Sequence, residues 1–189
     1  MENTVGSLNE KQYAVILGCL LGDGTLRKKT NTLLEINHSY KQETYVLWLY
    51  DVLANLVGTF PKFRSSGHNR FSFRFTTLSL QELNHFYDLF YGNKGVKKIP
   101  ETLKLNGLSL AVWFMDDGSK SRNSVYLNTQ QFNTADHRIL LEALKQLGIS
   151  ANLNKDKRYH RIRVSVGSMT RFRELVRPFM VESMNYKLP

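Results

Sequence analysis

The chain has 189 residues, 42% hydrophobic and 12% aromatic, enough to bury a core as one domain or two small ones. Its 26 Lys and Arg residues outnumber 16 Asp and Glu residues, and the net charge of +10 favours nucleic acid as a partner. One cysteine excludes an internal disulfide and a cysteine-rich zinc site, and no apolar run reaches the roughly 20 residues of a membrane span. We therefore expect an intracellular, reducing compartment, either an organelle matrix or a prokaryotic cytoplasm, and no membrane contact.

The first half predicts the order helix, two strands, helix, two strands, helix. Ser7 and Glu10 have the spacing of a capping box, which opens an apolar helix that runs to about Gly22. The following elements are expected as a hairpin over 24–40, a helix over 42–57, strands over 62–64 and 70–76, and a helix over 79–91. Gly18 and Gly22 stand one helical turn apart, which favours close packing against another helix.

A segment rich in glycine and lysine, "GNKGVKKIP", separates the two halves. The second half repeats the order with a helix ending at Asp116, strands near 124–131, a helix over 135–147 closed by Gly148, strands near 151–155 and 161–166, and a last helix over 169–180. We predict an α+β fold of two pseudo-symmetric αββαββα halves, 1–92 and 108–189, joined by the linker 93–107.

Each half places an Asp-Gly pair at the end of an apolar helix. "ILGCLLGDG" ends in Asp23 and Gly24, and "LAVWFMDDG" ends in Asp117 and Gly118 about half the chain later. A single Asp-Gly pair is also a common way to end a helix, so the evidence for a function is that the pair occurs twice. The C-terminal end of a helix disfavours an isolated carboxylate but favours a cation. Two such acids brought together could hold divalent metal ions on phosphates.

Two strands alternate large apolar residues with arginine and small polar residues. In "RFSFRFT" and "RIRVSV" one face is Phe, Ile or Val and the other carries side chains able to pair with base edges, although an ordinary solvated face is the alternative. The strand residues expected to face DNA are Asn37, Arg70, Ser72, Arg74, Thr76, Tyr126, Asn128, Arg161, Arg163 and Ser165. The basic residues expected to contact phosphate from turns are Arg27, Lys28, Lys29, Arg64, Lys155, Lys157 and Arg158.

The two Asp-Gly helices resemble the paired motifs of the LAGLIDADG homing endonucleases, the second in the "WFMDDG" form of a double-motif subgroup. "KKIPETL", "LNTQQF" and "MNYKLP" resemble the same subgroup, so the resemblance covers nearly the whole chain. It implies a saddle of antiparallel sheets around a paired-helix interface. It also implies a monomer that cuts double-stranded DNA at a long, roughly palindromic site with Mg²⁺, for which Mn²⁺ can substitute, leaving short 3′ overhangs.

The resemblance also assigns roles to individual residues. It places metal ligation on Asp23 and Asp117, with Asp116 secondary and the carbonyls of Gly22 and Asp116 as further ligands. Lys97 and Lys187 would act near the scissile phosphates. Lys98 is the alternative to Lys97 in this role, because the two lysines are adjacent. Gln130 would orient water or contact DNA near the centre.

Three other functions are alternatives. A splicing maturase of the same fold would bind intron RNA, and a DNA-binding regulator would not cut; the intact Asp23 and Asp117 favour the nuclease over both. A nucleotide-binding enzyme built on "GDG" is disfavoured, because the patterns G-x-G-x-x-G and G-x-x-x-x-G-K-[ST] are absent.

Overall fold

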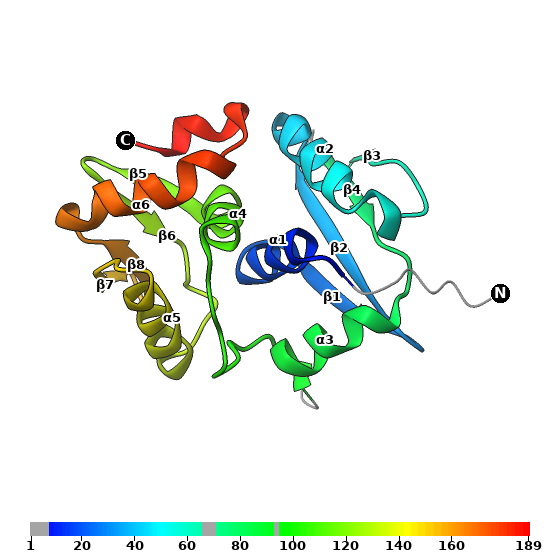
Figure 1. Cartoon of the computed structure of the whole chain (residues 1–189), viewed down its shortest axis with the longest axis horizontal. Helices are drawn as coiled ribbons and strands as arrows, with labels where there is room; N and C mark the ends of the chain where they lie inside the picture. Colours follow the sequence, from blue (N-terminus) through cyan, green and yellow to red (C-terminus); the bar gives the residue numbers. More distant parts are fainter. Residues whose placement is uncertain (1–7, 66–70, 93–94) are drawn as a thin grey trace.

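Two similar halves make up this computed structural model, which describes residues 8–65, 71–92 and 95–189 (Figure 1). Each half has a four-stranded antiparallel sheet, with strand orders β1-β2-β4-β3 and β5-β6-β8-β7. The α-helices and strands of the first half are α1 Glu10–Leu21, β1 Thr25–Lys28, β2 Thr32–Ser39, α2 Glu43–Val52, β3 Lys62–Ser65, β4 Phe71–Thr76 and α3 Asn84–Phe90. The α-helices and strands of the second half are α4 Gly107–Asp117, β5 Gly118–Ser121, β6 Ser124–Leu127, α5 Thr134–Gln146, β7 Ala151–Asp156, β8 Tyr159–Val164 and α6 Met169–Val176. The predicted α+β class and pseudo-symmetric halves are confirmed.

Helices α1 and α4 pack against each other at the centre, between the two sheets (Figure 1). They approach closely because α1 offers two glycines. A Cβ at Gly18 would lie 2.6 Å from the carbonyl oxygen of Ser109 and 2.6 Å from Cβ of Val112. The predicted close packing is confirmed, and the larger residues of α4 fill the space that the glycines leave.

Capping residues mark where the helices begin and end. Asn9 caps α1, since its side chain accepts from the Gln12 N–H at 2.8 Å and the Gln12 side chain accepts from the Asn9 N–H at 3.2 Å. The predicted capping box therefore lies two residues earlier than the observed one, and its Ser7 is outside the described residues. Gly148 ends α5 as predicted, with φ +77° and an Ile149 N–H bonded to the Leu144 carbonyl.

The first strand pair of the second half differs from the prediction of strands near 124–131. Strand β5 begins at Gly118, directly after α4, and β6 ends at Leu127. The turn between them uses Arg122 at φ +50°, a conformation that glycine favours, so no glycine marked the hairpin in the sequence. Asn128 and Gln130 consequently lie in the loop before α5. In the described part of the chain no helix is both long and apolar enough to span a membrane.

Candidate active site and nucleic-acid interface

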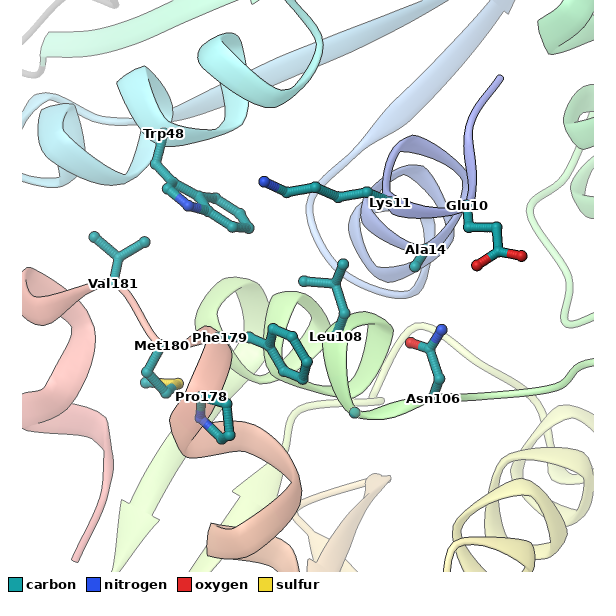
Figure 2. A pocket seen from close by; sticks show the side chains of 11 residues that line it. Glu10, Lys11, Ala14, Trp48, Asn106, Leu108, Pro178, Phe179, Met180 and Val181 are labelled. Carbon is teal, nitrogen blue, oxygen red and sulfur yellow. The ribbon is translucent and has the colours of Figure 1, made fainter. Parts of the chain in front are cut away.

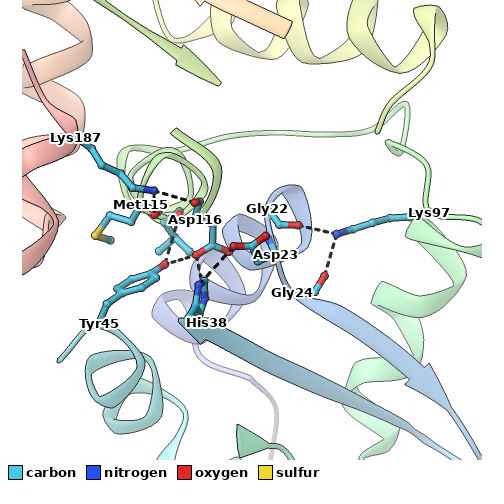
Figure 3. A network of polar contacts seen from close by, with 10 residues as sticks. Gly22, Asp23, Gly24, His38, Tyr45, Lys97, Met115, Asp116 and Lys187 are labelled. Atoms are coloured by element: carbon cyan, nitrogen blue, oxygen red, sulfur yellow. Dashed lines mark hydrogen bonds and ion pairs between the residues drawn. The ribbon is translucent and has the colours of Figure 1, made fainter. Parts of the chain in front are cut away.

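The acids of the two central helices meet where α1 and α4 end. Asp23 follows α1, its carboxylate is 47% exposed, and its backbone N–H donates to Oδ2 of Asp116 at 3.2 Å (Figure 3). Asp117 is the last residue of α4. Burial raises its pKa to about 7, and the nearby charges of Asp23 and Asp116 add to the shift. The fold thus gathers three carboxyl groups from two helix ends into one electrostatic cluster.

A lysine lies at each of these helix ends. Lys97 Nζ donates to the carbonyls of Gly22 and Gly24, both at 2.9 Å, at the end of α1 (Figure 3). Lys187 Nζ donates to the carbonyls of Met115 and Asp116, the latter at 2.9 Å, at the end of α4. Burial lowers the pKa of both lysines, and the nearby carboxylates oppose that effect. Lys98 is exposed, so the structure directs Lys97 rather than Lys98 toward the acids.

Asp116 belongs to a buried network between the halves. Its carboxyl group is fully buried, and Oδ1 accepts the hydroxyl of Tyr45 at 2.6 Å. The ring of His38 lies between it and Asp23 (Figure 3). Burial raises the pKa of Asp116 to about 8 despite the hydrogen bond from Tyr45. This side chain is closed off from solvent, and the secondary role in metal binding stays a prediction.

The face of the first sheet that points away from the core carries most of the DNA-facing side chains predicted for this half. Arg74 of β4 pairs in register with Asn37 of β2 and Lys62 of β3. Ser72 pairs with Arg64, and Thr76 shares this face by strand alternation. Arg70 lies outside the described residues. These side chains form one polar face. Arg27, on the edge strand β1, lies at its border and is ion-paired to Glu35 at 3.0 Å.

Lys28 is directed differently from its neighbours. It follows Arg27 and therefore points to the opposite face, where Nζ bonds Asp88 of α3 at 3.0 Å and lies 5.2 Å from the centre of the Tyr87 ring. Asp88 therefore offsets its charge in this placement, and its predicted contact with phosphate stays a prediction. Lys29 lies in the turn after β1.

The second sheet presents a tyrosine stacked with arginine. The guanidinium carbon of Arg161 lies 3.8 Å from the centre of the Tyr126 ring, and Tyr126 pairs in register with Arg163. Lys155 lies in β7 on the same face as Leu153, opposite the arginine face, and its predicted contact with phosphate stays a prediction. The remaining candidates of this half are Lys157 and Arg158 in the turn, and Ser165 just after β8.

Comparisons with known proteins identify the family. The model of the LAGLIDADG DNA endonuclease family matches residues 13–172. The chain belongs to this family. It is 30% identical to the DNA endonuclease I-ChuI of Chlamydomonas applanata, with 96% of each covered. It is also 30% identical over its full length to the cytochrome b mRNA maturase bI2 of Saccharomyces cerevisiae, of which it spans only 49%.

A solved structure has the same fold. The homing endonuclease I-WcaI bound to its DNA recognition sequence superposes with a TM-score of 0.91 at 25% identity, covering 100% of this chain and 90% of that one. The LAGLIDADG helices of this chain are α1 and α4, whose C-terminal acids are Asp23 and Asp117.

The donor set at the ends of the LAGLIDADG helices fits a hard divalent cation. Within the described ranges no three His, Cys, Asp or Glu side chains are placed so that they could hold a metal ion together. Mg²⁺ does not need one, because it commonly uses one or two carboxylates plus waters and substrate phosphates. Burial, and then repulsion from Asp23 and Asp116, raises the pKa of Asp117, and such an ion would relieve the repulsion. The carbonyls of Gly22 and Asp116 already accept lysine ammoniums, so a metal bound to either would lie beside a positive charge.

Two residues of this LAGLIDADG site escaped the sequence analysis, and one candidate was placed elsewhere. His38 and Tyr45 contact the acids; the available signal was a histidine on the core-facing side of a strand, after Leu34 and Ile36. Gln130 donates to Asp156 of β7 at 2.9 Å, and within the described residues it makes no hydrogen bond with Asp23, Asp116 or Asp117. Its predicted role near the centre stays a prediction.

Proposed function

We propose that this chain is a site-specific endonuclease that cuts double-stranded DNA at one long, roughly palindromic site and leaves short 3′ overhangs. The observation that carries the proposal is the pairing of Asp23 and Asp117 at the ends of α1 and α4, each helix end bonded by a lysine. Membership of the family and the likeness to a DNA-bound homing endonuclease support it. One chain supplies both halves, so the active form is a monomer.

The duplex would lie along the polar faces of both sheets. Arg74 and Asn37 of the first sheet, and Arg163 and Tyr126 of the second, would reach base edges, because arginine and asparagine present the donors that major-groove edges accept. Exposed basic residues of the turns would contact phosphate and fix the register without reading sequence. The halves differ in these side chains, so the two half-sites would differ as well.

Asp23 and Asp117 would hold Mg²⁺ or Mn²⁺, which when bound polarises the scissile phosphate and lowers the pKa of a coordinated water. Lys97 and Lys187 would place positive charge beside the phosphates on which negative charge develops. Their ammoniums are already oriented by helix carbonyls, so little reorganisation is needed when DNA arrives. The buried Asp116 would fix the relative position of the two helix ends instead of touching substrate.

A library of random duplexes, incubated with Mg²⁺ and sequenced at the cut ends, tests this proposal. We expect one enriched, near-palindromic site with staggered ends, lost in Asp23→Asn and in Asp117→Asn. Both variants should still bind that site in Ca²⁺, which separates loss of chemistry from loss of binding. Binding without cleavage by the unaltered chain in Mg²⁺ and Mn²⁺ would exclude the nuclease.

The maturase relative supports a second candidate, an RNA-binding splicing factor on the same scaffold. Splicing assistance does not require the acid pair. Intron RNA that is bound and spliced equally well by the unaltered chain and by Asp23→Asn, with no DNA cut, would favour this function.

A further inference from the structure

His38 is a buried histidine between two acids of different halves. It lies on β2 with its side chain 1% exposed. Its Nδ1 is 3.5 Å from Oδ2 of Asp23, and its Nε2 is 3.6 Å from Oδ1 of Asp116 (Figure 3). Both separations are within ion-pair range but longer than a hydrogen bond, and within the described residues neither ring nitrogen makes a hydrogen bond of good geometry, although the Gln42 side chain lies near enough to oppose the effect of burial, which lowers the pKa of the ring. A buried polar group left in this way calls for an explanation.

The network around His38 is one-sided. Asp116 comes from α4, while its three partners Tyr45, His38 and the backbone of Asp23 all come from the first half. The motif position of α1 equivalent to Asp116 is Gly22, which has no side chain to build a matching network. In the described parts of the chain no hydrogen bond or ion pair holds the Asp117 carboxylate. Of the two motif acids Asp23 and Asp117, only Asp23 therefore has an imidazole behind it.

We propose that His38 is a positioning residue for Asp23: it fixes the carboxylate of the first half against the buried acid of the second. The inference rests on the proposed nuclease function. Catalytic groups must be held to within about 0.5 Å, and a 1 Å displacement can cost about 100-fold in rate. Because Asp117 lacks this support, losing His38 disturbs one end of the acid pair. The two DNA strands are then cut at unequal rates.

The imidazole acts through Asp23 and does not touch the DNA. Its ring is packed edge-on against Tyr45, with centroids 5.3 Å apart, which sets the ring plane. The contact should therefore affect turnover and leave the affinity for DNA unchanged, since the polar faces of the sheets are separate from this network.

A nicking assay on supercoiled plasmid carrying the enriched site tests the inference. His38→Phe keeps a ring but removes both nitrogens, and His38→Gln keeps a donor. For His38→Phe we expect one strand to be cut about 10-fold to 100-fold more slowly, so that nicked circles accumulate, with KM unchanged. His38→Gln should recover part of the lost rate. His85→Gln, a change at an exposed histidine on α3, should match the unaltered chain.

Equal slowing of both strands, a change in KM alone, or no recovery in His38→Gln would overturn the inference. A second measurement needs neither DNA nor metal: thermal unfolding in EDTA of His38→Phe, Asp23→Asn and the double variant. We expect non-additive shifts in Tm, because the two side chains interact. Additive shifts would contradict the contact. If the unaltered chain cuts no DNA, the nuclease proposal fails, and this cycle still decides whether His38 holds Asp23.

Discussion

Gly22 of α1 and Asp116 of α4 share one space, since a Cβ on Gly22 would lie 2.4 Å from Cβ of Asp116. Here the small residue of one motif helix accepts a buried acid of the other. A cavity of about 650 Å³ lies elsewhere, between the N-terminal ends of these helices, where Trp48 and Phe179 line it (Figure 2). The packing around Asp116 is therefore tight, and changes in volume at Gly22 should be felt.

Gly22→Ala should destabilise the chain by about 1–3 kcal/mol, as overpacking does, and lower Tm in thermal unfolding. Gly22→Ala should cost less in an Asp116→Gly chain, because glycine at 116 removes the Cβ, Cγ and Oδ2 atoms that the added Cβ would meet. Gly18→Ala should not be relieved by Val112→Ala, since the Ser109 carbonyl also blocks the site at 2.6 Å. Gly167→Ala, with no atom within 4 Å of the added Cβ, is the control. A Gly22→Ala chain as stable as this control would contradict the account.

Lys97→Met should slow DNA cleavage by about 100-fold or more while DNA binding in Ca²⁺ persists, because an oriented cation near the reacting phosphate is removed. Lys98→Met is the matched control: its side chain is exposed, so it should cut at nearly the normal rate. Single-turnover cleavage of the enriched duplex measures both. Equal losses in the two variants would show that the orientation of Lys97 toward α1 is not what matters.

The metal-free protein should lose stability as the pH rises from about 4 to about 7. The pKa of Asp117 is raised by burial, and then by Asp23 and Asp116, from 3.8 to about 7. In that window the folded chain keeps a proton that the unfolded chain has released, so each rise in pH favours unfolding. Tm measured in EDTA between pH 5 and pH 8 should therefore fall, and Asp117→Asn should flatten part of the slope. Asp116, with a pKa of about 8, extends the fall to higher pH.

Mg²⁺ should raise Tm more at pH 8 than at pH 5.5, because the ion competes with protons for the same carboxylates. An equal Mg²⁺ effect at both pH values, or an unchanged effect in Asp117→Asn, would place the ion elsewhere.

Arg163→Ala should cost about 1–3 kcal/mol in binding and relax the sequence preference at a few base pairs of one half-site. The control is Lys155→Ala in the neighbouring strand, which removes the same charge from the opposite face of the sheet. It should leave the sequence preference unchanged. Selection of cleaved or bound sites from a randomised half-site separates the two, and a similar loss of preference in both variants would disprove the assignment of the DNA-facing side.

The sequence by itself determined the fold class, the duplication and the acids. Repeated Asp-Gly pairs after apolar helices, and strands that alternate phenylalanine with arginine, are local patterns whose period fixes which side chains share a face. They predicted that Arg74 and Arg163 would lie on polar faces and that Gly18 and Gly22 would allow close helix packing.

Only the tertiary structure decided which ammonium enters the end of α1, that Lys28 and Lys155 point away from the arginine faces, and that His38 and Tyr45 join Asp116. These contacts join residues many positions apart, and Lys97 and Lys98 are indistinguishable by type and spacing. A sequence period reports the direction of a side chain within its own element. Its partner depends on how the two halves pack, because the partner belongs to another element.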